Sequence, residues 1–221
     1  MRNLSHRQYT DEKESRMIYE FRTYDLKPRS VPEFEKRTAA KWEEGRGNYS
    51  DLFGFWQTEA GPLNQVVHVW PYEDLNQRSE VRSKVVAEGV WPPDNSEFML
   101  NMNSEIFLPA PFMEYRGAAK LGPVYEMRIY TYQSGDIPKV IDKWSQHIEE
   151  RQKYSPLVGA WYSELGNLNT WIHMWAYESY DQRAEVRAET RAKGVWPPPG
   201  GIAPLKQENK LLLPLSVSPL Q

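Results

Sequence analysis

The chain has 221 residues, with 27 basic and 30 acidic side chains, a net charge of −3 and no cluster of lysine and arginine. This charge balance argues against nucleic acid as a partner. The absence of cysteine excludes disulfides, thiolate metal sites and a cysteine nucleophile. No apolar run approaches the roughly 20 residues needed to span a bilayer, so we expect no membrane span.

The first sixteen residues are polar and mixed in charge. Acidic side chains such as Asp11 and Glu12 lie among the arginines of this segment, whereas a mitochondrial presequence is poor in acids. We therefore expect a disordered leader over residues 1–16 and a cytoplasmic protein.

The rest of the sequence repeats itself once, at a spacing of 106 residues that becomes 105 after a one-residue gap. YEFRTY at 19–24 recurs as YEMRIY at 125–130, QRSEVR at 77–82 as QRAEVR, and VWPP at 90–93 is repeated without change. Matches in one order at one spacing indicate an internal duplication. We predict unit 1 over residues 17–112, a linker over 113–122 and unit 2 over 123–218.

Each unit predicts the order β-α-β-β-α-β, which is the ferredoxin-like arrangement. In chain order, unit 1 has expected strands at 17–24, 52–59, 65–72 and 104–109, with helices beginning at Ser30 and Asp74. Unit 2 has expected strands at 124–131, 157–164, 170–177 and 208–214, with helices beginning at Asp136 and Ser179. The fold class is therefore α+β, with two tandem ferredoxin-like units packed sheet to sheet within one chain.

Strand alternation separates two faces of each predicted sheet. One face is mostly apolar and varies between the copies, as packing against helices tolerates. The other combines aromatic and ionisable side chains that are identical in both copies. They are Glu20, Arg22, Tyr24, Trp56, His68 and Trp70 in unit 1, and Glu126, Arg128, Tyr130, Trp161, His173 and Trp175 in unit 2.

This second face has two interpretations. A structural one makes Glu20 and Arg22 a buried ion pair and His68 a hydrogen-bonded interface residue. A functional one places a ligand cavity between the two sheets, with His68 and His173 as candidate catalytic bases whose pKa a neighbouring carboxylate would raise. A metal shared by the two histidines lacks ligand spacing, so we predict neither a metal nor a cofactor.

Two further groups flank these positions. Trp91 and Trp196, each followed by two prolines, are expected either to close an end of the barrel or to contact a ligand. Four arginines lie at i,i+4 spacing on the second helices, which predicts either salt bridges or contacts to an anionic ligand. They are Arg78, Arg82, Arg183 and Arg187.

Together, the repeated YEFRTY-type strand, the HVWPYE and HMWAYE strands, the QRxEVR helices and the terminal LLLPLSVSPL resemble the NIPSNAP family over residues 17–221. The resemblance implies the dimeric α+β barrel fold, whose relatives include cofactor-free monooxygenases, lactone isomerases, cyclases and haem enzymes. Animal members of the family look like mitochondrial proteins that are linked to vesicle traffic and mitophagy signalling. The resemblance implies no particular reaction.

Two functions remain open from the sequence. The first is a small-molecule protein that binds an apolar or aromatic ligand, either neutral or anionic, in cavities between the sheets, with or without histidine acid–base chemistry. The second is an interaction or scaffold protein without catalysis. Whether the chain is an enzyme, and whether it forms a homo-oligomer, is left open.

Overall fold

The computed structural model describes residues 17–115 and 117–221, so the predicted leader at 1–16 lies outside the described residues. Unit 1 comprises β1 (Ile18–Leu26), α2 (Val31–Glu43), the 3-10 helix η1 (Arg46–Asn48), β2 (Gly54–Ala60), β3 (Gln65–Tyr72), α3 (Leu75–Ala87), the 3-10 helix η2 (Ser96–Phe98) and β4 (Met99–Pro109). Unit 2 comprises β5 (Val124–Thr131), α4 (Ile137–Ser145), α5 (Ile148–Gln152), β6 (Leu157–Leu165), β7 (Thr170–Tyr177), α6 (Tyr180–Ala192) and β8 (Lys206–Pro214).

The second helix of each unit begins where its capping residues predict. The side chains of Asp74 and Ser179 accept hydrogen bonds from the backbone N–H of Gln77 and Gln182. The capping bond expected at the start of α2 is not formed. Ser30 makes no side-chain cap bond, and its hydroxyl instead donates to the Lys27 carbonyl at 2.6 Å.

In the described part of the chain, the strands close into one barrel in the order β1-β3-β2-β8-β5-β7-β6-β4. Within each unit the first strand pairs with the third and fourth strands. Between units, β2 pairs with β8 and β4 pairs with β6. These two junctions join the sheets edge to edge, which removes their free edges. The predicted intrachain barrel of two tandem units is therefore confirmed.

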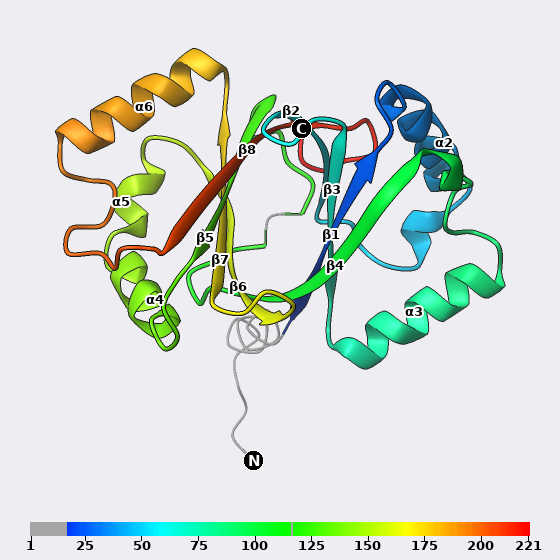
Figure 1. Cartoon of the computed structure of the whole chain (residues 1–221), viewed down its shortest axis with the longest axis horizontal. Helices are drawn as coiled ribbons and strands as arrows, with labels where there is room; N and C mark the ends of the chain where they lie inside the picture. Colours follow the sequence, from blue (N-terminus) through cyan, green and yellow to red (C-terminus); the bar gives the residue numbers. More distant parts are fainter. Residues whose placement is uncertain (1–16, 116) are drawn as a thin grey trace.

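The helices lie outside the barrel. Figure 1 shows α4, α5 and α6 along one side and α2 and α3 along the other. No helix in the described residues is both long and apolar enough to cross a membrane. Each sheet therefore has an inner face toward the other unit and an outer face toward its own helices.

The barrel interior is packed with aromatic and aliphatic side chains from both units. Tyr19 and Phe21 contact the ring of Trp161, with centroid separations of 5.8 and 5.0 Å. Glycine is needed beside these indoles, because a Cβ at Gly54 or Gly159 would lie about 2 Å from the Trp56 or Trp161 ring.

The predicted orientation of the sheets is wrong. Strand alternation groups Glu20, Arg22 and Tyr24 correctly, but this face lies under the helices and the apolar Tyr19–Phe21 face fills the barrel. The physical reason is that α3 and α6 carry arginines that partner the buried carboxylates, whereas the centre of the barrel is filled by apolar side chains. Cavities that reach the histidines therefore lie between sheet and helices, instead of between the two sheets.

Candidate functional site

A buried carboxylate organises the outer face of each sheet. Glu126 on β5 is fully buried and accepts hydrogen bonds from Arg128 at 2.8 Å and from Arg183 of α6 at 2.6 Å, with Arg187 at 3.5 Å. The matching Glu20 on β1 binds Arg22 at 2.7 Å and Arg78 of α3 at 2.6 Å. The predicted partnering of these charges is present in both units, and it ties each second helix to its sheet.

These carboxylates stay ionised. Burial by itself would raise the pKa of Glu126, but the hydrogen bond from Arg183 and the charges of Arg128 and Arg187 outweigh burial and lower the pKa to about 2. Glu20 behaves in the same way and also has a pKa of about 2. Three of the four arginines at i,i+4 spacing, Arg78, Arg183 and Arg187, therefore form salt bridges, as the first of their two interpretations predicted.

Each histidine is locked by a neighbouring tryptophan. The indole N–H of Trp175 donates to Nδ1 of His173 at 2.8 Å, and Trp70 donates to Nδ1 of His68 at 2.6 Å. In a neutral imidazole whose Nδ1 accepts, Nε2 carries the proton. Neither Nε2 has a hydrogen-bond partner among the described residues, and both atoms are buried. Each ring thus offers one unused N–H donor.

The predicted protonation of the histidines is wrong. Burial, followed by the positive charge of Arg128, holds the pKa of His173 well below 6.5, and the raising effect of Glu126 is smaller. His68 has the same shift for the same reasons, with Arg22 as the nearby charge. Both rings are therefore neutral near pH 7, and the geometry makes them hydrogen-bond donors instead of general bases.

A second arginine in each unit is buried without a carboxylate partner. Arg151 of α5 is 2% exposed, its guanidinium lies 4.0 Å from the Trp175 ring, and its bonds go to the hydroxyls of Ser155 and Tyr177. Arg46 occupies the same position over Trp70. The Nε atoms of both arginines lack partners among the described residues. A buried, unpaired guanidinium is costly unless an anion is present.

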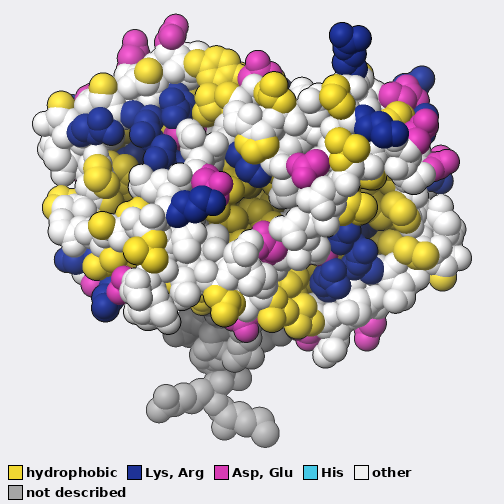
Figure 2. Space-filling view, viewed as in Figure 1, with side chains coloured by type: hydrophobic (Ala, Val, Ile, Leu, Met, Phe, Trp, Pro, Cys, Tyr) yellow, Lys and Arg dark blue, Asp and Glu magenta, His cyan; other side chains and the backbone are white. Residues whose placement is uncertain are grey.

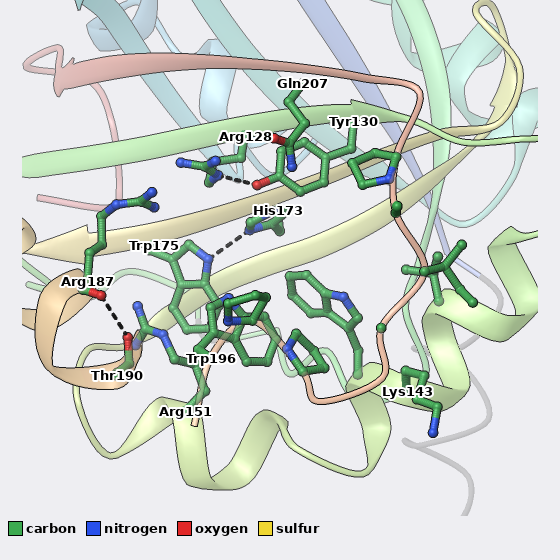
Figure 3. Close-up of a pocket in the computed structure, with 18 of the residues that line it drawn as sticks. Arg128, Tyr130, Lys143, Arg151, His173, Trp175, Arg187, Thr190, Trp196 and Gln207 are labelled. Atoms are coloured by element: carbon green, nitrogen blue, oxygen red, sulfur yellow. Dashed lines mark hydrogen bonds between the residues drawn. The ribbon is translucent and has the colours of Figure 1, made fainter. Parts of the chain in front are cut away.

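In unit 2 these groups meet in one cavity of about 390 Å³ between the sheet and the helices. Figure 3 shows Arg128, Tyr130, His173 and Trp175 projecting from the strands toward Arg151 and Trp196. Trp144 of α4 and Trp196 form the aromatic wall, with ring centroids 4.5 Å apart, and Trp144 also packs on His173.

Basic side chains dominate the polar lining of this cavity. Among the described residues, five basic side chains and no acidic one line it. They are Arg128, Lys143, Arg151, Arg187 and Arg191. Figure 2 shows lysine and arginine gathered beside a hydrophobic hollow on the left of the molecule, where Figure 1 places unit 2. An aromatic chamber with surplus positive charge favours an anion that carries an apolar body.

The corresponding cavity of unit 1 is about 430 Å³ and reaches His68, Tyr24 and Trp91. Apolar side chains such as Phe34 and Phe55 line the rest of it, and Asp94 is its one charged residue in the described chain. The two cavities therefore share a histidine and a tryptophan but differ in charge.

The structure places the predicted site residues in two groups. Of the twelve residues predicted on the polar faces, ten do lie on the faces under the helices. Trp56 and Trp161 do not, because they pair with Val67 and Ile172 and point into the barrel core. Trp91 and Trp196 do not close a barrel end, since they pack on Trp70 and Trp175 outside the sheet. No metal-binding cluster of three ligands occurs among the described residues.

Sequence reasoning missed Arg46 and Arg151, and also Lys143, Trp144 and Arg191. A signal for the first two was present, because RGNYS at 46–50 and RQKYS at 151–155 repeat at the spacing of the duplication. The other three are specific to unit 2, so comparison of the two copies could not single them out.

The comparisons with known proteins agree with this architecture. The model of the NIPSNAP family matches residues 19–114 and again 125–219. The chain belongs to the NIPSNAP family. Human NipSnap homolog 3A is 30% identical over 93% of this chain and 86% of its own length, and human NipSnap homolog 3B is 31% identical over 92% and 86%.

The fold of this NIPSNAP chain is also found in a solved structure of low sequence identity. The putative monooxygenase of Fusobacterium nucleatum has a TM-score of 0.67, 11% identity and coverage of 91% of this chain and 94% of its own. At this identity the likeness shows the two-unit barrel alone.

Proposed function

We propose that this NIPSNAP chain binds a small organic anion with an apolar or aromatic body in the outer cavity of unit 2. The observation that carries the proposal is the lining of five basic residues and, in the described chain, no acidic one. It includes the buried Arg151, which has no carboxylate partner among these residues. A bound carboxylate or similar group would supply the missing counter-charge.

Each lining residue would contact a different part of the ligand. Arg151 would bind the anionic group, since it has no carboxylate partner among the described residues, whereas Arg128 hydrogen-bonds to Glu126 and Tyr130. Arg187 would assist it, because its contact with Glu126 is longer, at 3.5 Å. The free Nε2–H of His173 would donate to a second oxygen of the ligand. Trp144 and Trp196 would pack on its apolar body.

This arrangement supports binding more directly than acid–base catalysis. A neutral imidazole whose Nδ1 is occupied by an indole N–H has no lone pair left for proton abstraction. Histidine catalysis is therefore the less favoured part of the function predicted from the sequence. The predicted cytoplasmic location and a homo-oligomeric state stay predictions, and the site depends on neither.

The test is a titration with a matched pair of probes, 2-naphthoate and its neutral analogue 2-naphthamide. Quenching of tryptophan fluorescence reports on Trp144, Trp175 and Trp196, which line the cavity. We expect one naphthoate per chain, bound at least about tenfold more tightly than naphthamide, because charge-assisted hydrogen bonds are roughly twice as strong as neutral ones. Equal binding of the two probes, or none, would reject the anion site and favour the interaction-protein alternative.

A further inference from the structure

A separate cavity lies at one mouth of the barrel, where strand ends of both units meet. Its volume is about 560 Å³. The floor is apolar and is contributed by Phe21, Phe107, Met127, Ile129 and Ile172. The rim is polar, and Figure 2 shows a hollow with a hydrophobic floor and charged surroundings between the two halves of the molecule. This cavity shares no lining residue with the outer cavity of unit 2.

Lys210 of β8 is the basic residue deepest in this mouth. It lies opposite Met127 in the β5–β8 register, and its Nζ donates to the side-chain carbonyl of Gln65. No carboxylate of residues 17–115 or 117–221 lies within ion-pair distance of it. Lys206, four residues earlier on the same strand, has a 64% exposed side chain and pairs with Glu208 at 3.2 Å. The strand thus carries one desolvated lysine on a neutral amide and one ordinary surface lysine.

This setting raises the fraction of uncharged amine at Lys210. Burial lowers its pKa, and the charges of Asp25, Glu208 and Glu105 oppose that shift only in part. A lysine desolvated in an apolar site is a stronger nucleophile at neutral pH, because more of it carries a free lone pair.

We propose that Lys210 is a carbonyl-reactive amine that forms an imine with aldehydes whose apolar tail lies on the floor of the barrel mouth. The Nζ lone pair attacks the carbonyl carbon, and the carbonyl oxygen takes up a proton to give a carbinolamine. The amine nitrogen has by then given up one of its two protons. The carbinolamine hydroxyl takes up a proton and leaves as water, and the nitrogen releases its one remaining proton, so one aldehyde and one amine give one imine and one water.

The duplication makes this site single in each chain. The position equivalent to Lys210 in unit 1 is Glu105, at the same spacing of 105 residues that relates Pro109 to Pro214. Glu105 accepts hydrogen bonds from the backbone N–H and the side-chain amide of Asn167, at 3.0 and 3.1 Å. One wall of the mouth thus carries the amine and the other a carboxylate, so we expect one imine per chain.

The experiment treats the full chain at pH 7.5 with hexanal and sodium cyanoborohydride, and it locates alkylated lysines by peptide mass spectrometry over time. We expect Lys210 to be labelled faster than Lys206, because burial lowers the pKa of the Lys210 amine. The Lys206→Arg variant should keep the fast labelling at Lys210, and the Lys210→Arg variant should show no fast-labelled lysine in the barrel mouth. Acetaldehyde, which lacks the tail, should show a smaller preference for Lys210.

Two results would overturn the proposal. Labelling of Lys210 at or below the rate of Lys206 would show that its amine is not activated. An equal preference for Lys210 with hexanal and acetaldehyde would show that the apolar floor takes no part. Because wild-type protein supplies both results, neither depends on a variant that folds poorly.

Discussion

The outer cavities of the two units differ although their frames are the same. Both have the glutamate, the arginine on its strand, the His–Trp pair and the arginine over the tryptophan. Unit 2 adds Lys143, Trp144 and Arg191, which correspond to Arg37, Thr38 and Val86 of unit 1. Duplication therefore preserved the groups that hold sheet and helices together, while the cavity lining diverged.

One position shows why the cavity of unit 1 has less positive charge in its lining than the cavity of unit 2. Arg37 corresponds to Lys143, but it pairs with Glu33 at 3.0 Å and Glu97 at 2.9 Å outside the cavity. Lys143 has no ion-pair partner among the described residues and lines the unit 2 cavity. The comparison separates the buried arginine that both copies keep, Arg46 or Arg151, from the charge of Lys143, which is unpaired in unit 2 alone among the described residues.

The largest expected effect tests the shared frame. Replacement of Glu126 by Gln leaves Arg128, Arg183 and Arg187 without their common counter-charge, so we expect a loss of about 3 kcal/mol in the free energy of unfolding. Glu20→Gln should lower the free energy of unfolding by a similar amount, because Arg22 and Arg78 lose their counter-charge. Urea unfolding of both variants measures this. Unchanged stability of either would show that its carboxylate is not structural.

The next largest effect tests the difference between the units. Arg151→Met should weaken 2-naphthoate binding by about 30-fold, since it removes a buried guanidinium from the proposed anion site. Arg46→Met removes the matching guanidinium of unit 1 and should leave the affinity unchanged. Fluorescence titration of both variants, after thermal unfolding confirms that they fold, decides the point. Equal losses in the two variants would mean that the arginines act through stability alone.

A smaller effect is expected from the cavity rim. Lys143→Gln and Arg191→Gln each remove a charge that is partly or fully exposed, where solvent screens the attraction. We expect each to weaken naphthoate binding by only about threefold. A calorimetric titration at two salt concentrations measures it. An effect as large as that of Arg151→Met would place the anion at the rim instead of inside the cavity.

The smallest expected effect concerns pH, because the naphthoate affinity should not change as the pH is varied. Protonation of His173 would add positive charge and tighten anion binding as the pH falls. Because burial and the charges of Arg128, Arg151 and Arg187 hold its pKa well below 6.5, despite Glu126, the ring stays neutral from pH 8 to 6. The naphthoate affinity should therefore be flat over this range. Tightening centred near pH 6.5 would mean that His173 titrates normally.

Much of the fold could be predicted from the sequence, because the repeat and the strand periodicity are local signals. The pairing of β1 with β3, which places Arg22 beside His68, follows from the ferredoxin-like order. The side of the sheet that faces the helices could not be predicted, because it depends on where Arg78 and Arg183 find their partners. Trp56 was misplaced because the register of β2 against β3 sets its face, and periodicity alone does not fix a register.

The site was predictable only where the copies agree. His68, His173 and their tryptophans stood out because they are repeated, and the structure brings each pair together. The cavity charge of unit 2 depends on Arg151, Lys143 and Arg191, which come from three separate helices. The repeat of RGNYS as RQKYS could have singled out Arg151, but that the three side chains meet is a matter of tertiary packing, which no spacing in the sequence reveals.

The central claim is that the outer cavity of unit 2, and not that of unit 1, is an anion site. Crystals soaked with 6-bromo-2-naphthoate test it most directly, because anomalous scattering from bromine locates the ligand. The account predicts one bromine position per chain beside Trp144 and Trp196, with the carboxylate at Arg151. Bromine in both outer cavities at equal occupancy, or beside Trp91 alone, would contradict it.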